Sequence, residues 1–354
     1  MKLVKNLLRG SQTSIVVDAN IPFPSVHAEK PADLLVHCPS HQATQLKQSG
    51  CLATETDIRS LFIKDESTRM GLGSFKALGA AYVIAHAAAE TGSENMSAAL
   101  KGQTYVTASA GNHGLSVAAG AAIFGANSII FLSQTVPSAF ADRLRDKGAE
   151  VRVEGDDYEA SMQAAAQLAE DQGFILLSDS SWAGYYELPH RLMEGYLVAA
   201  KESVDQIPEI PSHIFLQAGV GGLAGAFAAF YREAWGDAPT ITVVEPDAAP
   251  ALQASIEAGK SVFADGPVSN MGRLDCKEPS LIALKGLARD ADYFLTISDD
   301  LATQVLNRLG EEGMPSSQSG IAGIAALYTD DGLKKAMGLE DTSVVLSILS
   351  EGDD

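Results

Sequence analysis

Three glycine-rich turns constrain this 354-residue chain more than any other feature, because each joins a strand-like run to an Ala-rich helical run. They cover residues 71–76, 107–114 and 219–225. Turns of this kind direct backbone N–H groups and the positive end of a helix dipole at an anion. Strands that alternate with helices in this way are typical of βαβ units and a mainly parallel sheet.

The strand-like runs indicate how many sheets the chain forms. Nine are expected, at residues 61–63, 105–107, 128–132, 150–153, 174–177, 214–217, 240–244, 293–297 and 343–349. Nine strands are many for one open sheet, so two sheets in two domains are expected. A chain of 354 residues is long enough for two such cores. The sequence therefore predicts an α/β fold with two domains, each a mainly parallel sheet flanked by helices.

Charge and cysteine usage exclude several classes of function. The net charge of −20 argues against nucleic acid and anionic membranes as partners, and no uncharged apolar run of about 18 residues predicts a membrane span. The three cysteines include no CxxC pair, so neither a disulfide framework nor a zinc site is expected. Residues 1–9 are basic but lack the apolar core of a secretory signal. Reduced thiols in a cytoplasmic protein, with no metal, are the expectation.

Lys76 is the residue in these turns most suited to covalent chemistry. It stands where a helix is expected to begin, and the positive end of the helix dipole disfavours its ammonium form. The sequence therefore predicts a lowered pKa for Lys76 and a neutral amine that attacks carbonyl groups. The alternative is a lysine that merely decorates the surface.

The third turn is the candidate phosphate site. It lies between a strand and a helix, and it lacks the Gly-Lys-Ser/Thr ending of an ATP-binding loop. A dinucleotide fold is also disfavoured, because the first βα unit carries a lysine where that fold has its glycine fingerprint. The alternative is a tight turn that packs a helix on a sheet. The residues expected to wrap a phosphate are Gly219, Val220, Gly221, Gly222 and Leu223.

These segments together resemble the fold-type II enzymes that depend on pyridoxal phosphate (PLP), and within them the ammonia-lyase and dehydratase branch. The likeness extends over residues 36–350 and is carried by residues 64–76, 111–114, 179–185, 217–221, 244–247 and 276–279. It resembles the diaminopropionate ammonia-lyases most, within the threonine and serine dehydratase superfamily. The resemblance implies a small domain, residues 98–185, inserted in a large domain of residues 1–97 and 186–354. Residues 1–35 are expected to form an arm on the surface or at a subunit contact.

The resemblance also assigns roles to single residues. It implies that Lys76 binds the PLP aldehyde covalently and that Asn112 donates to the 3′ oxygen, although an Asn that caps the next helix is the alternative. Ser319 is expected beside the pyridine nitrogen, with Ser317 or a plain turn as alternatives. Asp179 is expected to handle the leaving group, unless it is only a turn or N-cap residue.

Ala110 is the informative departure from this family. Relatives that act on D-substrates or racemise carry an acid or a hydroxyl there, whereas alanine moves no proton. The expected function is β-elimination from a small L-amino acid such as 2,3-diaminopropionate, which gives a 2-oxo acid and ammonia. An L-threonine or L-serine dehydratase is the alternative, and a catalytically silent PLP-fold protein is a third reading. The resemblance also implies a homodimer.

Overall fold

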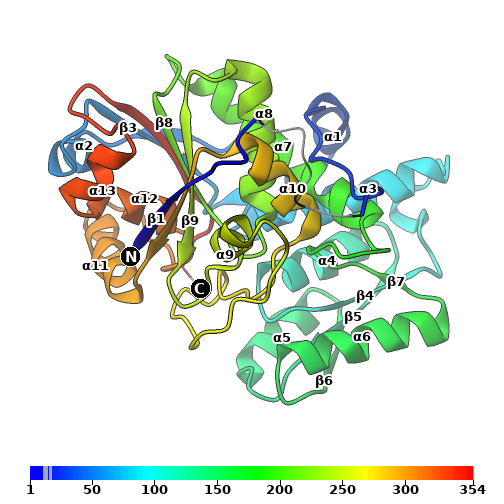
Figure 1. Ribbon diagram of the computed structural model, residues 1–354. Helices are drawn as coiled ribbons and strands as arrows, with labels where there is room; N and C mark the ends of the chain where they lie inside the picture. The colour runs from blue at the N-terminus through cyan, green and yellow to red at the C-terminus, as the bar shows by residue number, and fades with distance from the viewer. Residues whose placement is uncertain (11–14, 16–17, 354) are drawn as a thin grey trace.

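The chain folds around two separate sheets (Figure 1). A computed structural model describes residues 1–10, 15 and 18–353. The larger sheet has the strand order β1-β10-β9-β8-β11-β3-β2, and the smaller has the order β6-β5-β4-β7. The larger consists of β1 (Lys2–Lys5), β2 (Leu46–Gln48), β3 (Ser60–Asp65), β8 (His213–Gln217), β9 (Thr240–Pro246), β10 (Tyr293–Ile297) and β11 (Val344–Leu349). The smaller consists of β4 (Thr104–Ala108), β5 (Asn127–Leu132), β6 (Glu150–Val153) and β7 (Ile175–Leu176).

Burial explains why the inner strands are parallel. Every residue of β3, β8 and β11 is buried, as expected for strands that are covered on both faces by helices. β11 lies between β8 and β3 and pairs with both in parallel. Only the edge strands β1 and β2 run antiparallel to their neighbours. The carboxyl ends of the inner strands therefore meet along one edge of the sheet, where ligands bind in open α/β folds.

Helices cover both faces of the large sheet. In Figure 1, α7, α8 and α10 lie on one side of it, and α2 and α11 to α13 lie on the other. The helices are α1 (Glu29–Leu35), α2 (Gly50–Glu55), α3 (Lys76–Glu90), α4 (Asn112–Ile123), α5 (Ser138–Asp146), α6 (Tyr158–Gln172), α7 (Glu187–Gln206), α8 (Gly222–Trp235), α9 (Ala251–Ala258), α10 (Leu281–Asp290), α11 (Asp299–Glu311), α12 (Ala322–Ala325) and α13 (Asp331–Ala336).

Close contact between α3 and α7 fixes the helix that begins at Lys76. A Cβ atom on Gly195 of α7 would lie 2.5 Å from the carbonyl oxygen of Leu78, and one on Gly79 would lie 2.7 Å from the Tyr196 ring. Real Cβ atoms do not approach other atoms so closely, so only glycine lets the two helices touch here. α4 of the small sheet also packs on α3, so α3 lies between the two halves of the molecule.

The predicted α/β class with two mainly parallel sheets is confirmed, and each of the nine expected strands overlaps an observed one. The prediction missed β1 and β2, which are short and lie at sheet edges, where alternation is weakest. Residues 2–5 therefore join the sheet rather than form part of an arm, and residues 11–14 and 16–17 lie outside the described residues. The domain boundaries at residues 98 and 185 stay a prediction. No helix in the described part of the chain has the length and apolar character needed to cross a bilayer.

Candidate functional site

Lys76 and Asp179 form a half-buried ion pair at the centre of the candidate site. Lys76 is the first residue of α3, Asp179 follows β7, and the amine contacts the carboxylate. Burial alone would lower the pKa of Lys76, but the Asp179 carboxylate outweighs it and raises that pKa above its ordinary value. The same pairing holds the pKa of Asp179 well below its usual range, although burial acts in the opposite sense. The predicted lowering of the Lys76 pKa is therefore wrong for the cofactor-free chain, because the helix dipole is weaker than an adjacent carboxylate.

The segment before Lys76 is held in an unusual conformation. Met70, Gly71 and Gly73 have φ angles of 53°, 66° and 75°, in the left-handed region that favours glycine. The N–H of Phe75 then donates to the carbonyl of Ser350 at 3.1 Å, beyond the end of β11. The turn thus sets the lysine against the carboxyl end of the central strand.

Asn112 faces the end of β11 from the start of α4. Its amide nitrogen donates to Oε2 of Glu351 at 2.7 Å, and it makes no capping bond to its own helix, which excludes the capping alternative. Glu351 is buried, forms an ion pair with Arg273 and accepts a hydrogen bond from the hydroxyl group of Ser317. Because an amide NH₂ group carries two N–H donors, one bond to Glu351 orients Asn112 and leaves the second donor for another acceptor.

His113 braces the same loop. Its Nε2 lies 2.8 Å from the carbonyl of Leu177, which assigns the proton to that nitrogen. Burial lowers the pKa of His113, so the ring is neutral. Its Nδ1 is buried and has no hydrogen-bond partner among the described residues.

Residues 219–223 form a cradle at the N-terminus of α8. Gly221 has a φ of 97° and precedes the helix, which begins at Gly222. A Cβ on Gly219 would lie 3.0 Å from the sulfur of Cys276, whereas one on Gly222 would meet no protein atom closer than 3.6 Å. The first position therefore needs glycine for the fold itself. Gly222 has space for at least a methyl group beside it, at the positive end of a helix where anions bind.

The two serines predicted beside a pyridine nitrogen are already engaged. The Ser319 hydroxyl accepts the N–H of Arg273 at 3.1 Å, and the Ser317 hydroxyl donates to Glu351. Ser350 is linked to the residue just before Lys76. Its carbonyl accepts a hydrogen bond from the N–H of Phe75, and its own N–H donates to the carbonyl of Gly320. Its hydroxyl makes no hydrogen bond with the described residues.

Sequence reasoning missed Ser350, Glu351 and Arg273. The first two follow the buried strand β11 directly, which is the signal that identified Asp179 after β7. Arg273 stands in a loop between α9 and α10, and nothing in the local sequence marks it. Ala110 is exposed in the turn before Asn112, as its loop position leads one to expect.

Comparisons with known proteins show which proteins this chain is similar to. The diaminopropionate ammonia-lyase of Salmonella typhimurium (strain LT2) is 30% identical over 349 residues, which cover 89% of this chain and 86% of that protein. The crystal structure of diaminopropionate ammonia lyase from Escherichia coli in complex with D-serine matches with a TM-score of 0.89 and 28% identity, over 99% of this chain and 94% of that one. A second structure of the E. coli enzyme, in complex with an aminoacrylate-PLP azomethine reaction intermediate, matches with a TM-score of 0.89 and 27% identity, over the same shares.

The family comparison covers nearly the whole chain. The model described as "Pyridoxal-phosphate dependent enzyme" matches residues 38–351, a span that contains Lys76, Asn112, the glycine cradle, Asp179 and Glu351. The chain belongs to the pyridoxal-phosphate dependent enzymes.

Proposed function

We propose that this chain catalyses β-elimination from a small L-amino acid, with L-2,3-diaminopropionate as the substrate. Diaminopropionate and one water molecule would give pyruvate and two molecules of ammonia. The observation that carries the proposal is the Lys76–Asp179 pair. In the cofactor-free chain, the ammonium of Lys76 occupies the place beside Asp179 that the β-ammonium of such a substrate would take. The likeness to two diaminopropionate ammonia-lyases supports the same substrate.

The residues of the site fit pyridoxal phosphate. Lys76 supplies the amine for a covalent link to the cofactor aldehyde, and residues 219–223 supply a helix N-terminus with room for a phosphate. Asn112 has one amide N–H left for the 3′ oxygen. For the pyridine nitrogen, Ser319 remains the residue predicted from the sequence, and the unengaged hydroxyl of Ser350 is the candidate that the geometry adds.

The protein groups divide the reaction between them. Pyridoxal phosphate supplies an electron sink for negative charge at Cα of a bound amino acid. Lys76, when it is not bound to the cofactor, would be the base that takes the proton from Cα. Asp179, whose pKa is low in the cofactor-free chain, would pair with the β-ammonium of the substrate in place of Lys76 and keep it in that form. That form leaves as neutral ammonia with the bonding electrons, so this step needs no acid.

The dehydratase alternative would need Asp179 to donate a proton. Water leaves a 3-hydroxy amino acid only when the hydroxyl receives a proton. In the cofactor-free chain the Lys76 ammonium holds the pKa of Asp179 low, and a carboxylate that stays ionised is a poor proton donor. Ala110 favours the dehydratase alternative, because alanine at this position makes the loop resemble that of a threonine dehydratase. The charge of Asp179 favours elimination of ammonia.

Steady-state turnover of L-2,3-diaminopropionate against L-serine and L-threonine tests the proposal. We expect kcat/KM for diaminopropionate to exceed both others. Asp179→Asn keeps the shape and removes the charge, so it should lower diaminopropionate turnover by about 10²-fold or more and L-serine turnover by less. A wild-type preference for L-serine or L-threonine would overturn the proposal.

We also propose that the protein works as a homodimer in the cytoplasm. The family resemblance supports the dimer, and Leu7 and Val36 expose 87% and 65% of their surface, which is apolar area that a second subunit could cover. Three free thiols fit a reducing compartment. Light scattering coupled to gel filtration measures the subunit number directly, and a monomer at micromolar concentration would contradict the proposed homodimer.

A further inference from the structure

Tyr196 carries a buried hydroxyl group that the protein leaves without a hydrogen bond. The residue lies in the middle of α7 and is 1% exposed, and its oxygen has no partner among the described residues. Burying an unpaired hydroxyl destabilises a protein by about 1–3 kcal/mol, and buried tyrosines usually have a partner. Tyr231, also fully buried, follows the rule, because its hydroxyl lies 2.7 Å from that of Ser203.

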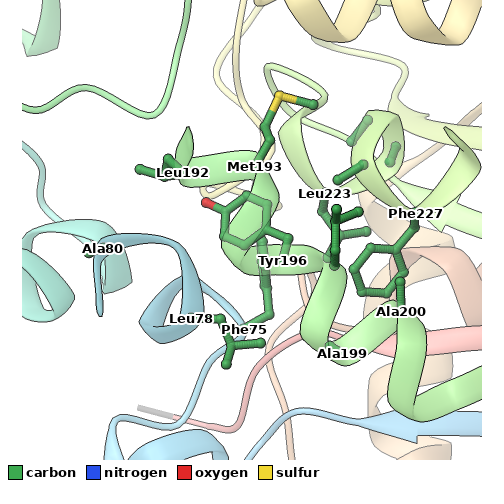
Figure 2. Close-up of a cluster of buried hydrophobic side chains, with 14 of the residues drawn as sticks. Phe75, Leu78, Ala80, Leu192, Met193, Tyr196, Ala199, Ala200, Leu223 and Phe227 are labelled. Atoms are coloured by element: carbon green, nitrogen blue, oxygen red, sulfur yellow. The ribbon is translucent and has the colours of Figure 1, made fainter. Parts of the chain in front are cut away.

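The ring of Tyr196 lies where two helices begin. Figure 2 shows it among Phe75 and Leu78 at the start of α3 and Leu223 at the start of α8. A Cβ on Gly79 would lie 2.7 Å from Cε1 of the ring, and one on Gly222 would lie 3.6 Å from Cε2. These two carbons flank the carbon that bears the hydroxyl. The hydroxyl end therefore faces the junction between the first turn of α3 and the first residue of α8.

This junction favours an anion. The first turns of α3 and α8, helices of 15 and 14 residues, both lie beside the Tyr196 ring. The first N–H groups of α8 lack helical partners, whereas the first N–H groups of α3 bond to Ser74 and Phe75. Burial raises the pKa of the Tyr196 phenol, so the group keeps its proton and acts as a donor. The amine of Lys76 is the alternative partner, because it interacts with the Tyr196 phenol and has N–H donors beyond the one that Asp179 accepts. Binding of pyridoxal distinguishes the two partners.

We propose that Tyr196 is a further binding residue of the cofactor site, whose hydroxyl donates a hydrogen bond to the phosphate of pyridoxal phosphate. The inference rests on the cofactor assignment above and not on the choice of substrate. A phosphate oxygen carries negative charge, and hydrogen bonds to charged acceptors are stronger than those between neutral groups. The same bond removes the cost of the unpaired hydroxyl, so cofactor binding and burial of Tyr196 become coupled.

Tyr196→Phe gives two effects of opposite sign. The cofactor-free variant should be as stable as the wild type or more stable, because no bond is lost and an unpaired polar group is removed. Its dissociation constant for pyridoxal phosphate should rise about tenfold. Tyr231→Phe is the matched control, which should lower the unfolding midpoint of the cofactor-free protein and leave cofactor affinity unchanged, because that hydroxyl has a protein partner.

Pyridoxal, which lacks the phosphate, locates the effect. Equilibrium dialysis should show that Tyr196→Phe binds pyridoxal as the wild type does. Equal affinity of variant and wild type for pyridoxal phosphate would overturn the proposal. An equal loss for pyridoxal would also overturn it, since the hydroxyl would then serve the lysine end of the site. If the wild type binds pyridoxal phosphate but does not turn over diaminopropionate, the proposed function fails and the role of Tyr196 stands.

Discussion

Two buried polar clusters flank the segment that leads to Lys76, and they differ in how completely their groups are paired. The closed network consists of Lys64, Glu66, Arg69 and Glu202. The open cluster consists of Lys76, His113, Asp179 and Tyr196. The closed network is almost fully buried, whereas Lys76 and Asp179 of the open cluster are half-buried. Both clusters combine residues that are far apart in the sequence.

In the closed network every charge meets an opposite charge. Arg69 donates to Glu66 at 2.7 Å through Nε and to Glu202 at 2.6 Å through Nη2, and Lys64 donates to Glu202 at 2.7 Å. Lys64, Glu66 and Arg69 are fully buried. The charges of this network are all paired, although Nδ1 of the neighbouring His41 has no partner among the described residues. The network fixes the turn that follows β3.

In the open cluster, one ion pair stands beside two polar atoms without partners among the described residues. These atoms are Nδ1 of His113 and the hydroxyl oxygen of Tyr196. Unpaired buried groups cost stability, and proteins retain them where a ligand supplies the missing bonds. The difference between the clusters separates the part of the interior that holds the fold from the part that receives a ligand.

Lys76→Ala breaks the open cluster at its centre and has the largest expected effect. The variant should lose the visible absorption band of the lysine-bound cofactor and at least about 10⁴-fold in turnover, because the covalent anchor and the base disappear together. Circular dichroism should show the native fold. Lys201→Ala, which removes an exposed lysine paired with Asp205, is the control and should change neither quantity. A fully active Lys76→Ala enzyme would refute the assignment of the site.

Arg69→Met breaks the closed network and should act on stability rather than on chemistry. It leaves Glu66 buried without a cation and Glu202 with Lys64 alone, which costs about 3–5 kcal/mol of unfolding free energy. Urea unfolding of the cofactor-free protein measures the loss. Arg308→Met removes a half-buried arginine that pairs with three more exposed glutamates and should have a smaller effect. Equal losses in the two variants would erase the distinction between the clusters.

The two enantiomers of one substrate test whether the open cluster supplies a base on only one face of the bound substrate. Lys76 is a base on one side, and Ala110, on the loop where relatives carry a second acid or base, is exposed and has no titratable group. We expect kcat/KM for D-diaminopropionate to be at least about 100-fold below that for the L-isomer. Comparable values would mean that Asp179 or a bound water serves the second face. Ala110→Asp should narrow the gap.

Gly222→Ala has the smallest expected effect, because it fills space without breaking a protein contact. Its new methyl group would stand 3.6 Å from the nearest protein atom, so the cofactor-free fold should be unaffected. The methyl group enters the cradle, and the dissociation constant of pyridoxal phosphate should rise about tenfold through loss of one bond to the phosphate. Gly310→Ala in α11 also meets no neighbour and serves as the control. Unchanged affinity for Gly222→Ala would remove residues 219–223 from the phosphate site.

The sequence could predict residues that stand in local motifs, but it could not predict pairings between residues that are far apart in the chain. Lys76, Asn112 and Gly221 were identifiable because each stands in a local strand–turn–helix motif, where the chemistry is set by neighbours in the chain. The raised pKa of Lys76 was not, because its cause is a carboxylate 103 residues away. The pairing of Arg69 with Glu202 spans 133 residues, and no local pattern marks either partner. Tyr196 looks like any apolar helix residue until the hydrogen bonds around it are examined.

The place of β11 in the sheet has a consequence for biosynthesis. All four strands of the smaller sheet lie between residues 104 and 176, so they can pair while the ribosome is still adding the rest of the chain. The larger sheet cannot close until residues 344–349 have left the exit tunnel, because β11 fills the gap between β8 and β3. Ser350 and Glu351 emerge directly after it. In a nascent chain that stops short of these residues, the small sheet can therefore form, but β8 and β3 lack their common partner. The cofactor site also lacks Ser350 and Glu351.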